Sequence, residues 1–450
     1  MPTPLTQALA EFVANPRIER SLPAAMRIAK IGLIDTVATA LAGCAEPAVR
    51  ILLEHLTAQG GTPEAPLLFT GTRLSTAHAA LVNAVAGHAL DYDDVSLSAH
   101  TSTVLIPTLL AEGHRLGASG SDVLRAYAVG YEVWADLHTR EPDPLHLKGW
   151  HPTSVFGTVA AAAAVAHLAK LPAHTVQTAL ALAASLSSGL VANFGTMTKP
   201  LHAGKAASHA IEAVRLAERG LTAAPDALEH RAGFLAALSP ASRVDLARPF
   251  EVDPDRLRLE SIGLSVKRYP VCYSCHRVID GAIALIEQHD LAPADVASVQ
   301  VRIGVAQASM LRNPRPVTGL EARFSIEFAV AAALVARRVG LAESSDAFVT
   351  QSAVQAQFAK VKVDTCDRPS EDSAFGYADR VSITCTDGRA FDSGDIRFAR
   401  GNARNPLDPA ELRQKFIDCV AYGGSGRNAG ALYERLAAFE DIDDVRGLFG

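Results

Sequence analysis

The chain has 450 residues, 49% of them hydrophobic, and a formal net charge of −6 at pH 7. One simple core does not serve a chain of this length, so we expect two or three domains or one large helical body with an insert. The 42 Lys and Arg residues form no basic run in either half, which excludes a nucleic-acid partner because phosphate binding needs such a patch.

The N-terminal segment and the cysteines indicate the compartment. Residues 1–21 carry several charges and lack the continuous apolar segment of a secretory signal. The nearest approach to a membrane-spanning helix, residues 155–169, is too short and contains His167. The six cysteines are scattered without the spacing of a disulfide framework. We therefore expect a cytoplasmic protein with no membrane partner.

Apolar residues recur at helical spacing through most of the first 262 residues. The clearest case runs from Pro23 to Leu41, and Gly43 closes it. Residues 155–168 are mostly Ala, Val and Gly, so this helix must be buried on most sides, and we expect it to pack closely on the helix that follows. A short extended piece is expected at residues 67–70. The remaining helices are expected at residues 76–90, 103–116, 121–138, 173–190 and 201–219.

Strand-like segments begin near Gly263. A hairpin turn is expected at residues 386–388, and Asp408 followed by Pro409 indicates the start of a C-terminal helix. The strands are expected at residues 264–267, 297–303, 360–363, 380–385 and 389–391, and the helices between them at 278–288, 326–339 and 345–358.

These elements predict a mainly α protein. A large all-α helical domain is expected to comprise residues 1–262 and 399–450, with the C-terminal tail returning to the body. A smaller α+β domain is expected to comprise residues 263–398.

An acidic cluster stands out in the helical part. Asp91, Asp93 and Asp94 follow the mostly apolar residues 79–90, and His100 comes shortly after. The C-terminal carbonyls of a helix already carry partial negative charge, so acids at this end need another reason. A lone Asp would be a solvated turn or a cap, but three acids followed by a His favour a functional site.

A second candidate is the start of the buried Ala-rich helix, where His151 precedes Thr153 and Ser154. A helix N-terminus offers free N–H donors and the positive end of the helix dipole, which makes it an anion site. The alternative is structural: Thr153 or Ser154 is only an N-cap, and His151 packs on Trp150.

Two further polar segments interrupt apolar structure. Lys199 precedes Pro200, so we expect it to be extended and to abut the helix that starts at Leu201. Residues 267–276 join a strand to a helix at the domain junction, where ligand clefts are favoured.

The same junction contains a Cys-x-x-Cys-His pattern, formed by Cys272, Cys275 and His276. Haem attachment is excluded because no export signal accompanies the pattern, and structural zinc needs a second ligand pair that Cys366 and Cys385 do not supply. Phosphate-binding glycine motifs and the Gly-x-Ser-x-Gly elbow are missing from the sequence. We therefore expect acid–base chemistry without cofactor or metal. A small polycarboxylate suits it, because cations hold the carboxylates while a base removes a proton α to one of them.

Several segments are characteristic when they are taken together and in order: residues 88–94, His100, and residues 149–154, 195–204, 267–272 and 321–325. They resemble the MmgE/PrpD family, which includes 2-methylcitrate dehydratases, cis-aconitate decarboxylases and iminodisuccinate epimerases. The resemblance implies a large all-helical domain with a smaller α+β lid, a homodimer, and a metal-free active site in the cleft between the domains.

By position, the resemblance implies that Asp91, His100, His151, Lys199 and Lys267 are the catalytic residues. It also implies a set of substrate-binding residues: Thr153, Thr198, His202, Tyr269, Cys272, His276 and Arg323.

Departures from the decarboxylase pattern direct the functional prediction. The decarboxylases carry His where this chain has Cys272 and Thr where it has Val95, and the interval from Asp94 to His100 is shorter here. We therefore expect a hydro-lyase similar to 2-methylcitrate dehydratase, with epimerisation of a dicarboxylate such as iminodisuccinate as the alternative. Cis-aconitate decarboxylation and non-catalytic carboxylate binding rank below these. The loop at residues 95–99 is expected to set the substrate preference.

Overall fold

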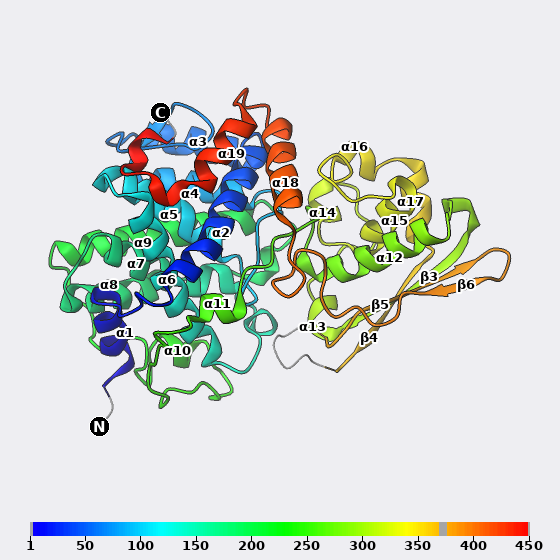
Figure 1. The fold of residues 1–450 in the computed structure, drawn as a ribbon. Helices are drawn as coiled ribbons and strands as arrows, with labels where there is room; N and C mark the ends of the chain where they lie inside the picture. Colours follow the sequence, from blue (N-terminus) through cyan, green and yellow to red (C-terminus); the bar gives the residue numbers. More distant parts are fainter. Residues whose placement is uncertain (1–2, 369–375, 449–450) are drawn as a thin grey trace.

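The computed structural model describes residues 3–368 and 376–448, and helices build most of it. In Figure 1 the helical body carries the blue to green helices together with the red C-terminal ones, and the lid lies beside it. The long helices of the body are α1 (Leu5–Ala14), α2 (Leu22–Gly43), α3 (Pro47–Gln59), α4 (Thr76–His88), α5 (Thr101–Leu116), α6 (Gly120–Thr139), α7 (Pro152–Leu168), α8 (Ala173–Leu186), α9 (Thr198–Glu218), α18 (Pro409–Tyr422) and α19 (Ala429–Ala437).

Helix α7 forms the centre of the body and packs against α6, α8 and α9. Its Ala-rich sequence carries no acid, Lys or Arg, and nearly all of its residues are buried, as predicted. A Cβ atom at Gly130 of α6 would lie 2.8 Å from the Ala164 Cβ, so the missing side chain allows α6 and α7 to approach closely.

The lid contains a four-stranded sheet in the order β4-β3-β5-β6, with β3 parallel to β4 and antiparallel to β5. Helices α12 (His276–Gln288) and α15 (Ile326–Ala336) pack together, and they contact β5 and β4 respectively. The strands are β3 (Val296–Gly304), β4 (Val361–Cys366), β5 (Arg380–Cys385) and β6 (Ala390–Asp392).

Shorter elements complete the described part of the chain. The body has a two-stranded ribbon of β1 (Ala65–Pro66) and β2 (Arg73–Leu74) and the short helices α10 (Phe234–Ala237) and α11 (Arg258–Ile262). The lid has the short helices α13 (Val305–Ala308), α14 (Gly319–Ala322), α16 (Asp346–Val349) and α17 (Ser352–Phe358).

Two separate apolar clusters fill the body and the lid. The first takes its buried side chains from residues 5–266 and 412–448, and the second takes them from residues 269–385. Helices α18 and α19 both pack against α2, so the C-terminal tail returns to the body. The mainly α fold class with a smaller α+β part is confirmed, while the predicted domain limits stay a prediction.

Several local predictions were wrong. Residues 67–70 form a turn beside the short ribbon rather than a strand, and residues 264–267 contribute only a single bridge, between Ser265 and Val95. Lys199 is helical rather than extended, because Pro200 lies in the first turn of α9, where its missing N–H costs no helical hydrogen bond. The helix predicted at residues 345–358 is broken into α16 and α17.

No single helix in the described residues has both the length and the apolar composition to cross a membrane. The bent pair α2 and α3 meets these two criteria only when the helices are counted together.

Candidate active site

A cavity of about 360 Å³ lies between the body and the lid. One wall is apolar, since Cys272, Met310 and Phe324 form a small buried cluster on which Phe194 packs. The polar end of the cavity adjoins this wall and includes Asp91, His100, His151 and Lys199. Two arginines from the segment after the lid sheet, Arg397 and Arg404, contribute positive charge to the lining.

Asp91 is the most strongly paired carboxylate of the site. Its side chain is 5% exposed, and Oδ1 lies 2.6 Å from Lys199 Nζ and 3.1 Å from Lys267 Nζ. Burial alone would raise the pKa of Asp91, but the two ammonium groups outweigh burial and hold the pKa well below its ordinary value. Asp91 is therefore ionised, and it forms ion pairs with both lysines.

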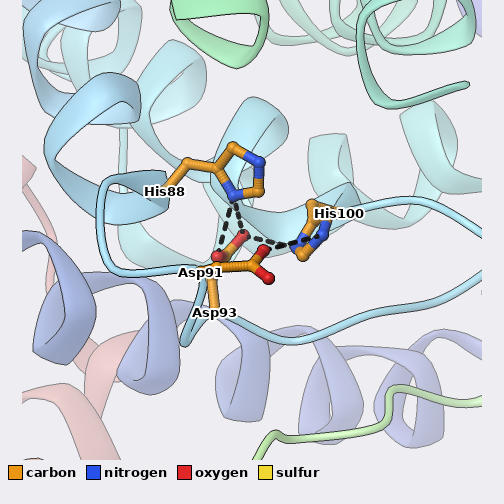
Figure 2. A group of neighbouring side chains, drawn as sticks. All are labelled: His88, Asp91, Asp93 and His100. Atoms are coloured by element: carbon orange, nitrogen blue, oxygen red, sulfur yellow. Dashed lines mark hydrogen bonds and ion pairs between the residues drawn. The ribbon is translucent and has the colours of Figure 1, made fainter. Parts of the chain in front are cut away.

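Asp93 bridges two histidine rings, as Figure 2 shows. Its Oδ1 lies 2.9 Å from His88 Nδ1, and its Oδ2 lies 2.9 Å from His100 Nδ1. Burial would raise the pKa of Asp93, but the two rings lower it well below the ordinary range. Asp93 therefore fixes the orientation of both imidazoles.

Lys199 lies in the first turn of α9 and fixes the tautomer of His88. Its ammonium group lies 2.8 Å from His88 Nε2, and an ammonium can only donate, so Nε2 is the unprotonated nitrogen. The Nδ1–H of His88 then donates to Asp93. The rings of Phe194 and Phe324 each lie 5.4 Å from Lys199 Nζ, which keeps the lysine against the apolar wall.

His151 and His202 form a second histidine pair, with their Nδ1 atoms 3.2 Å apart. Burial lowers the pKa of both, that of His202 to about 4, so the pair is neutral and shares one proton between the facing nitrogens. Thr153 Oγ1 accepts a hydrogen bond from the backbone N–H of His100 at 3.1 Å, and this bond joins the start of α7 to the segment that follows the acidic turn.

The structure thus brings together all five predicted catalytic residues. Cys272 also lies in the cavity wall, where burial raises the pKa of its thiol and keeps it neutral. Thr153 and His202 contact two of the catalytic residues: Thr153 accepts from the backbone of His100, and His202 pairs with His151.

Four predicted substrate-binding residues have other partners, and their direct role stays a prediction. The Thr198 N–H donates to Thr196, and the Tyr269 hydroxyl donates to Asp280 at 2.6 Å. His276 Nε2 lies 3.3 Å from the Val271 carbonyl oxygen. The guanidinium of Arg323 donates to the Ala89 carbonyl at 2.6 Å.

The sequence reasoning gave no role to several residues that shape the site. His88 and Asp93 belong to the same stretch as Asp91, and a buried His in the last turn of an apolar helix was the available signal for His88. Phe324 lies in the segment 321–325 that carries the family resemblance, but no role was assigned to it. The others come from separate segments and were given no role: His146, Phe194, Met310, Arg397 and Arg404.

A metal ion is the main alternative occupant of the polar end. Ligand atoms of His88, Asp91, Asp93 and His100 all lie within 4.8 Å of one another. However, Lys199 and Lys267 already neutralise Asp91, and a divalent cation here would face two ammonium groups. These residues therefore suit a site in which Asp91 pairs with two lysines better than they suit a metal site.

The fold and the cleft define a class of protein: a mainly α body with an α+β lid that enclose a buried lysine, carboxylate and histidine cluster. Sequence models of the MmgE/PrpD N-terminal domain and the MmgE/PrpD C-terminal domain match residues 7–247 and 269–435. The chain belongs to the MmgE/PrpD family, which confirms the resemblance carried by its motifs.

Curated relatives are named cis-aconitate decarboxylase. The human protein is 31% identical over 385 residues, which cover 83% of this chain and 78% of the relative. The mouse protein is 33% identical over 358 residues, or 76% and 72% of the two chains. A relative from Aspergillus terreus is 25% identical over 298 residues, or 61% and 60%. These relatives support a lyase, but they are carboxy-lyases and give no support to the hydro-lyase prediction.

Proposed function

We propose that this chain is a lyase that acts on a small di- or tricarboxylate by acid–base chemistry of its own side chains. The observation that carries this proposal is the arrangement of Lys199 and Lys267 around Asp91 at the polar end of the cavity. Paired ammonium groups in a buried site are suited to hold a carboxylate and to stabilise the charge that develops next to it.

His100 is the proposed base. Its Nδ1 faces Asp93, so the lone pair of the neutral ring is on Nε2, which lies 3.5 Å from Asp91 Oδ1, and His100 lines the cavity. Asp93 would orient the ring and stabilise the imidazolium that forms when Nε2 takes a proton. The neutral pair of His151 and His202 has one shared proton and would deliver a proton to the carbon or leaving group.

Cis-aconitate is the first substrate to test, because the relatives at 31% and 33% identity are named for its decarboxylation. In that reaction the bond to the departing carboxylate breaks, its electron pair stays on the carbon skeleton, and a proton from the enzyme completes the product. Lys199, which lines the cavity, would hold a remaining carboxylate while Lys267 pairs with Asp91, and Arg397 and Arg404 would attract the anion to the cavity.

Removal of water from a hydroxy-tricarboxylate such as 2-methylcitrate is the second candidate. The observation in its favour is Cys272, a neutral thiol in the cavity wall at the position where the decarboxylase pattern has an imidazole. A thiol with a raised pKa neither carries positive charge nor donates a proton readily, so it does not replace that imidazole.

One panel separates the candidates. Purified protein is incubated in deuterated water with cis-aconitate, 2-methylcitrate, citrate and iminodisuccinate, and products and deuterium incorporation are followed by NMR. Carbon dioxide release from cis-aconitate identifies a decarboxylase, loss of water a hydro-lyase, and inversion with deuterium exchange an epimerase. Binding of tricarboxylates with neither product nor exchange would contradict the enzyme and indicate a carboxylate-binding protein.

Lys199→Met tests the site on whichever substrate turns over. We expect kcat to fall roughly 10²- to 10³-fold, because one charged donor to the developing negative charge is lost. The matched control is Lys205→Met, since Lys205 is an exposed lysine on the same helix. Equal turnover of the two variants would contradict the assignment of Lys199.

A further inference from the structure

Three cations from outside α4 donate to backbone carbonyls of the acidic turn. Arg323 donates to the Ala89 carbonyl at 2.6 Å, Lys267 to the Asp91 carbonyl at 2.7 Å, and Lys415 to the Tyr92 carbonyl at 2.8 Å. Carbonyls at a helix C-terminus carry partial negative charge that favours cations. The acids at this helix end are therefore balanced by groups from other parts of the chain.

Lys415 comes from the greatest distance along the sequence, on α18 of the C-terminal tail. It is 5% exposed, its Nζ lies 2.6 Å from Asp35 Oδ1, and the Tyr92 ring centroid is 4.0 Å away. Asp35, on α2, accepts a hydrogen bond from the Asp94 N–H at 2.8 Å. Lys415 and Asp35 together hold the backbone on both sides of Asp93.

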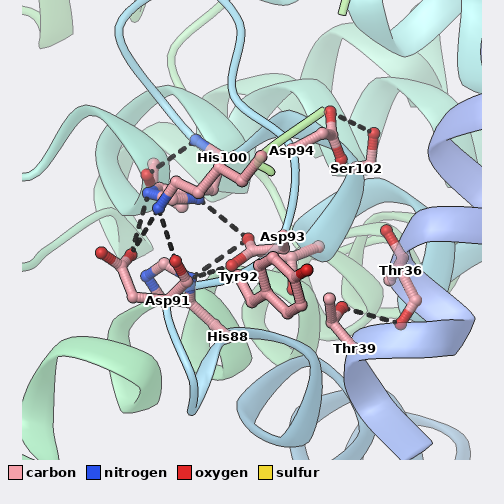
Figure 3. Close-up of polar contacts among 12 residues, drawn as sticks. Thr36, Thr39, His88, Asp91, Tyr92, Asp93, Asp94, His100 and Ser102 are labelled. Atoms are coloured by element: carbon pink, nitrogen blue, oxygen red, sulfur yellow. Dashed lines mark hydrogen bonds and ion pairs between the residues drawn. The ribbon is translucent and has the colours of Figure 1, made fainter. Parts of the chain in front are cut away.

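A further hydrogen bond holds the side chain of Asp94. Asp94 accepts a hydrogen bond from the Ser102 hydroxyl at 2.9 Å, as Figure 3 shows. In the same view the Tyr92 ring lies between Asp91 and His88 on one side and Thr36 and Thr39 of α2 on the other. The anchored side of the turn and the catalytic side are thus separate.

Asp91 needs this support because its backbone has φ of 50°. That left-handed conformation is uncommon for a residue with a side chain and persists only where the surroundings hold it. It directs the Asp91 carboxylate to Lys199 and Lys267. Loss of an anchor next to Asp91 would let the backbone relax and move both lysines.

We propose that Lys415 is a positioning residue for the active site. Through its bond to the Tyr92 carbonyl and its ion pair with Asp35, it keeps Asp91 in the conformation that places Lys199 and Lys267. The turnover test rests on the proposed function, whereas the structural test below does not.

The key variant is the double substitution K415M/D35N. Loss of Lys415 alone leaves Asp35 as a buried unpaired charge, which is strongly destabilising, whereas the double variant removes both charges. The amide that replaces the Asp35 carboxylate keeps an oxygen that can accept from the Asp94 N–H. We expect a melting temperature close to that of the wild type and a kcat lowered about 10- to 100-fold with KM changed less than about threefold, because small displacements of positioned groups cost rate.

The control is Arg413→Met. Arg413 is on the same helix but is partly exposed, and its Nε lies 3.6 Å from Glu434 Oε1. We expect this variant to leave kcat unchanged. Wild-type kcat in K415M/D35N would overturn the proposal, as would an equal loss in the control. If K415M/D35N does not fold, K415Q/D35N replaces it, with the same expected loss of kcat and the same contradicting outcome. The Gln side chain is shorter than Lys, so it pairs with the new amide on α2 and loses the hydrogen bond to the Tyr92 carbonyl.

A crystal structure of the folded double variant is the test that does not depend on turnover. We expect Asp91 to leave positive φ and its contact with Lys199 to lengthen beyond the present 2.6 Å. An unchanged Asp91 would overturn the proposal. If the wild-type protein turns over no substrate of the panel, the proposed function fails, and this structure still decides the role of Lys415.

Discussion

The role of an individual residue in the cleft depends more on the side chains it contacts than on its residue type. Asp91 and Asp93 are two positions apart, yet Asp91 faces two lysines and Asp93 faces two histidines. The sequence predicted a functional cluster here, and the family resemblance implied a catalytic role for Asp91 alone, but the different partners of Asp91 and Asp93 were not visible in the sequence. Each carboxylate is ionised because its partners outweigh the cost of burial.

The pH profile of turnover tests the proposed role of His100. Burial lowers the pKa of His100 to about 3, so the ring is neutral at every higher pH. We expect kcat/KM to show no loss from this group between about pH 5 and 8, and to fall only as the pH approaches 3. The measurement is kcat/KM from pH 4 to 8 on the confirmed substrate. An acidic limb centred near 6.5 would show that His100 is not held neutral by burial.

Removal of metal ions tests the nature of the polar end. Because Lys199 and Lys267 already neutralise Asp91, we expect dialysis against a chelator to leave turnover and melting temperature unchanged. Metal analysis of the dialysed protein by mass spectrometry verifies that removal is complete. Loss of activity that a divalent ion restores would instead assign His88, Asp91, Asp93 and His100 to a metal site.

At the level of elements, the helices were predicted best where their caps and periodicity agree. The start of α18 at Pro409 follows the Asp408 cap, whose side chain accepts from the Ala410 and Glu411 N–H groups. Lys199 was expected to be extended because residues before proline avoid the helical region, but Pro200 lies in the first turn of α9, where its missing N–H costs no helical hydrogen bond. The lysine consequently points from a rigid helix rather than from a loop.

Helix α6 carries a buried acid that gives a stability prediction. Glu132 accepts from the Leu259 N–H at 3.0 Å, and burial raises its pKa to about 7 from an ordinary 4.5. The folded protein therefore keeps this proton at pH values where the unfolded chain has lost it. The stability from the neutral carboxyl is complete below pH 4.5 and is lost as the pH rises through 7.

Glu132→Gln should remove this pH dependence. We expect the variant to be more stable than the wild type by about 3 kcal/mol above pH 7, with the difference vanishing near pH 4.5. Thermal or denaturant unfolding at several pH values measures it. Glu218→Gln, at an exposed position of α9, is the control and should show little difference at any pH. A pH-independent effect of Glu132→Gln would contradict the raised pKa.

At the scale of the whole molecule, the site exists because the lid and the body each complete what the other lacks. Cys272 lines the cavity from the start of the lid, where Lys267 also contacts Asp91, and Asp91 and Lys199 line it from the body. Arg323 of the lid also donates to a carbonyl of the body, so the two parts are joined at the catalytic turn.

A homodimer is the assembly that the family resemblance implies, and we keep it as a prediction. Light scattering after size-exclusion chromatography should give twice the chain mass of 47.4 kDa at micromolar concentration. Dilution should not change the elution volume if the assembly is tight. A mass equal to that of the single chain would contradict the prediction.

The sequence by itself determined the mainly α fold, most of the long helices, the four strands of the lid sheet, and the motifs around Asp91, His151, Lys199 and Lys267. These features follow from periodicity, caps and local spacing, which act over a few residues. Only the tertiary structure decided that Asp93 orients two histidines, that Lys415 reaches the turn from the C-terminal tail, and that Phe194 meets the Cys272 cluster. The last two contacts join segments far apart in the chain, and the energies of all three depend on burial and distance, which exist only in the folded protein.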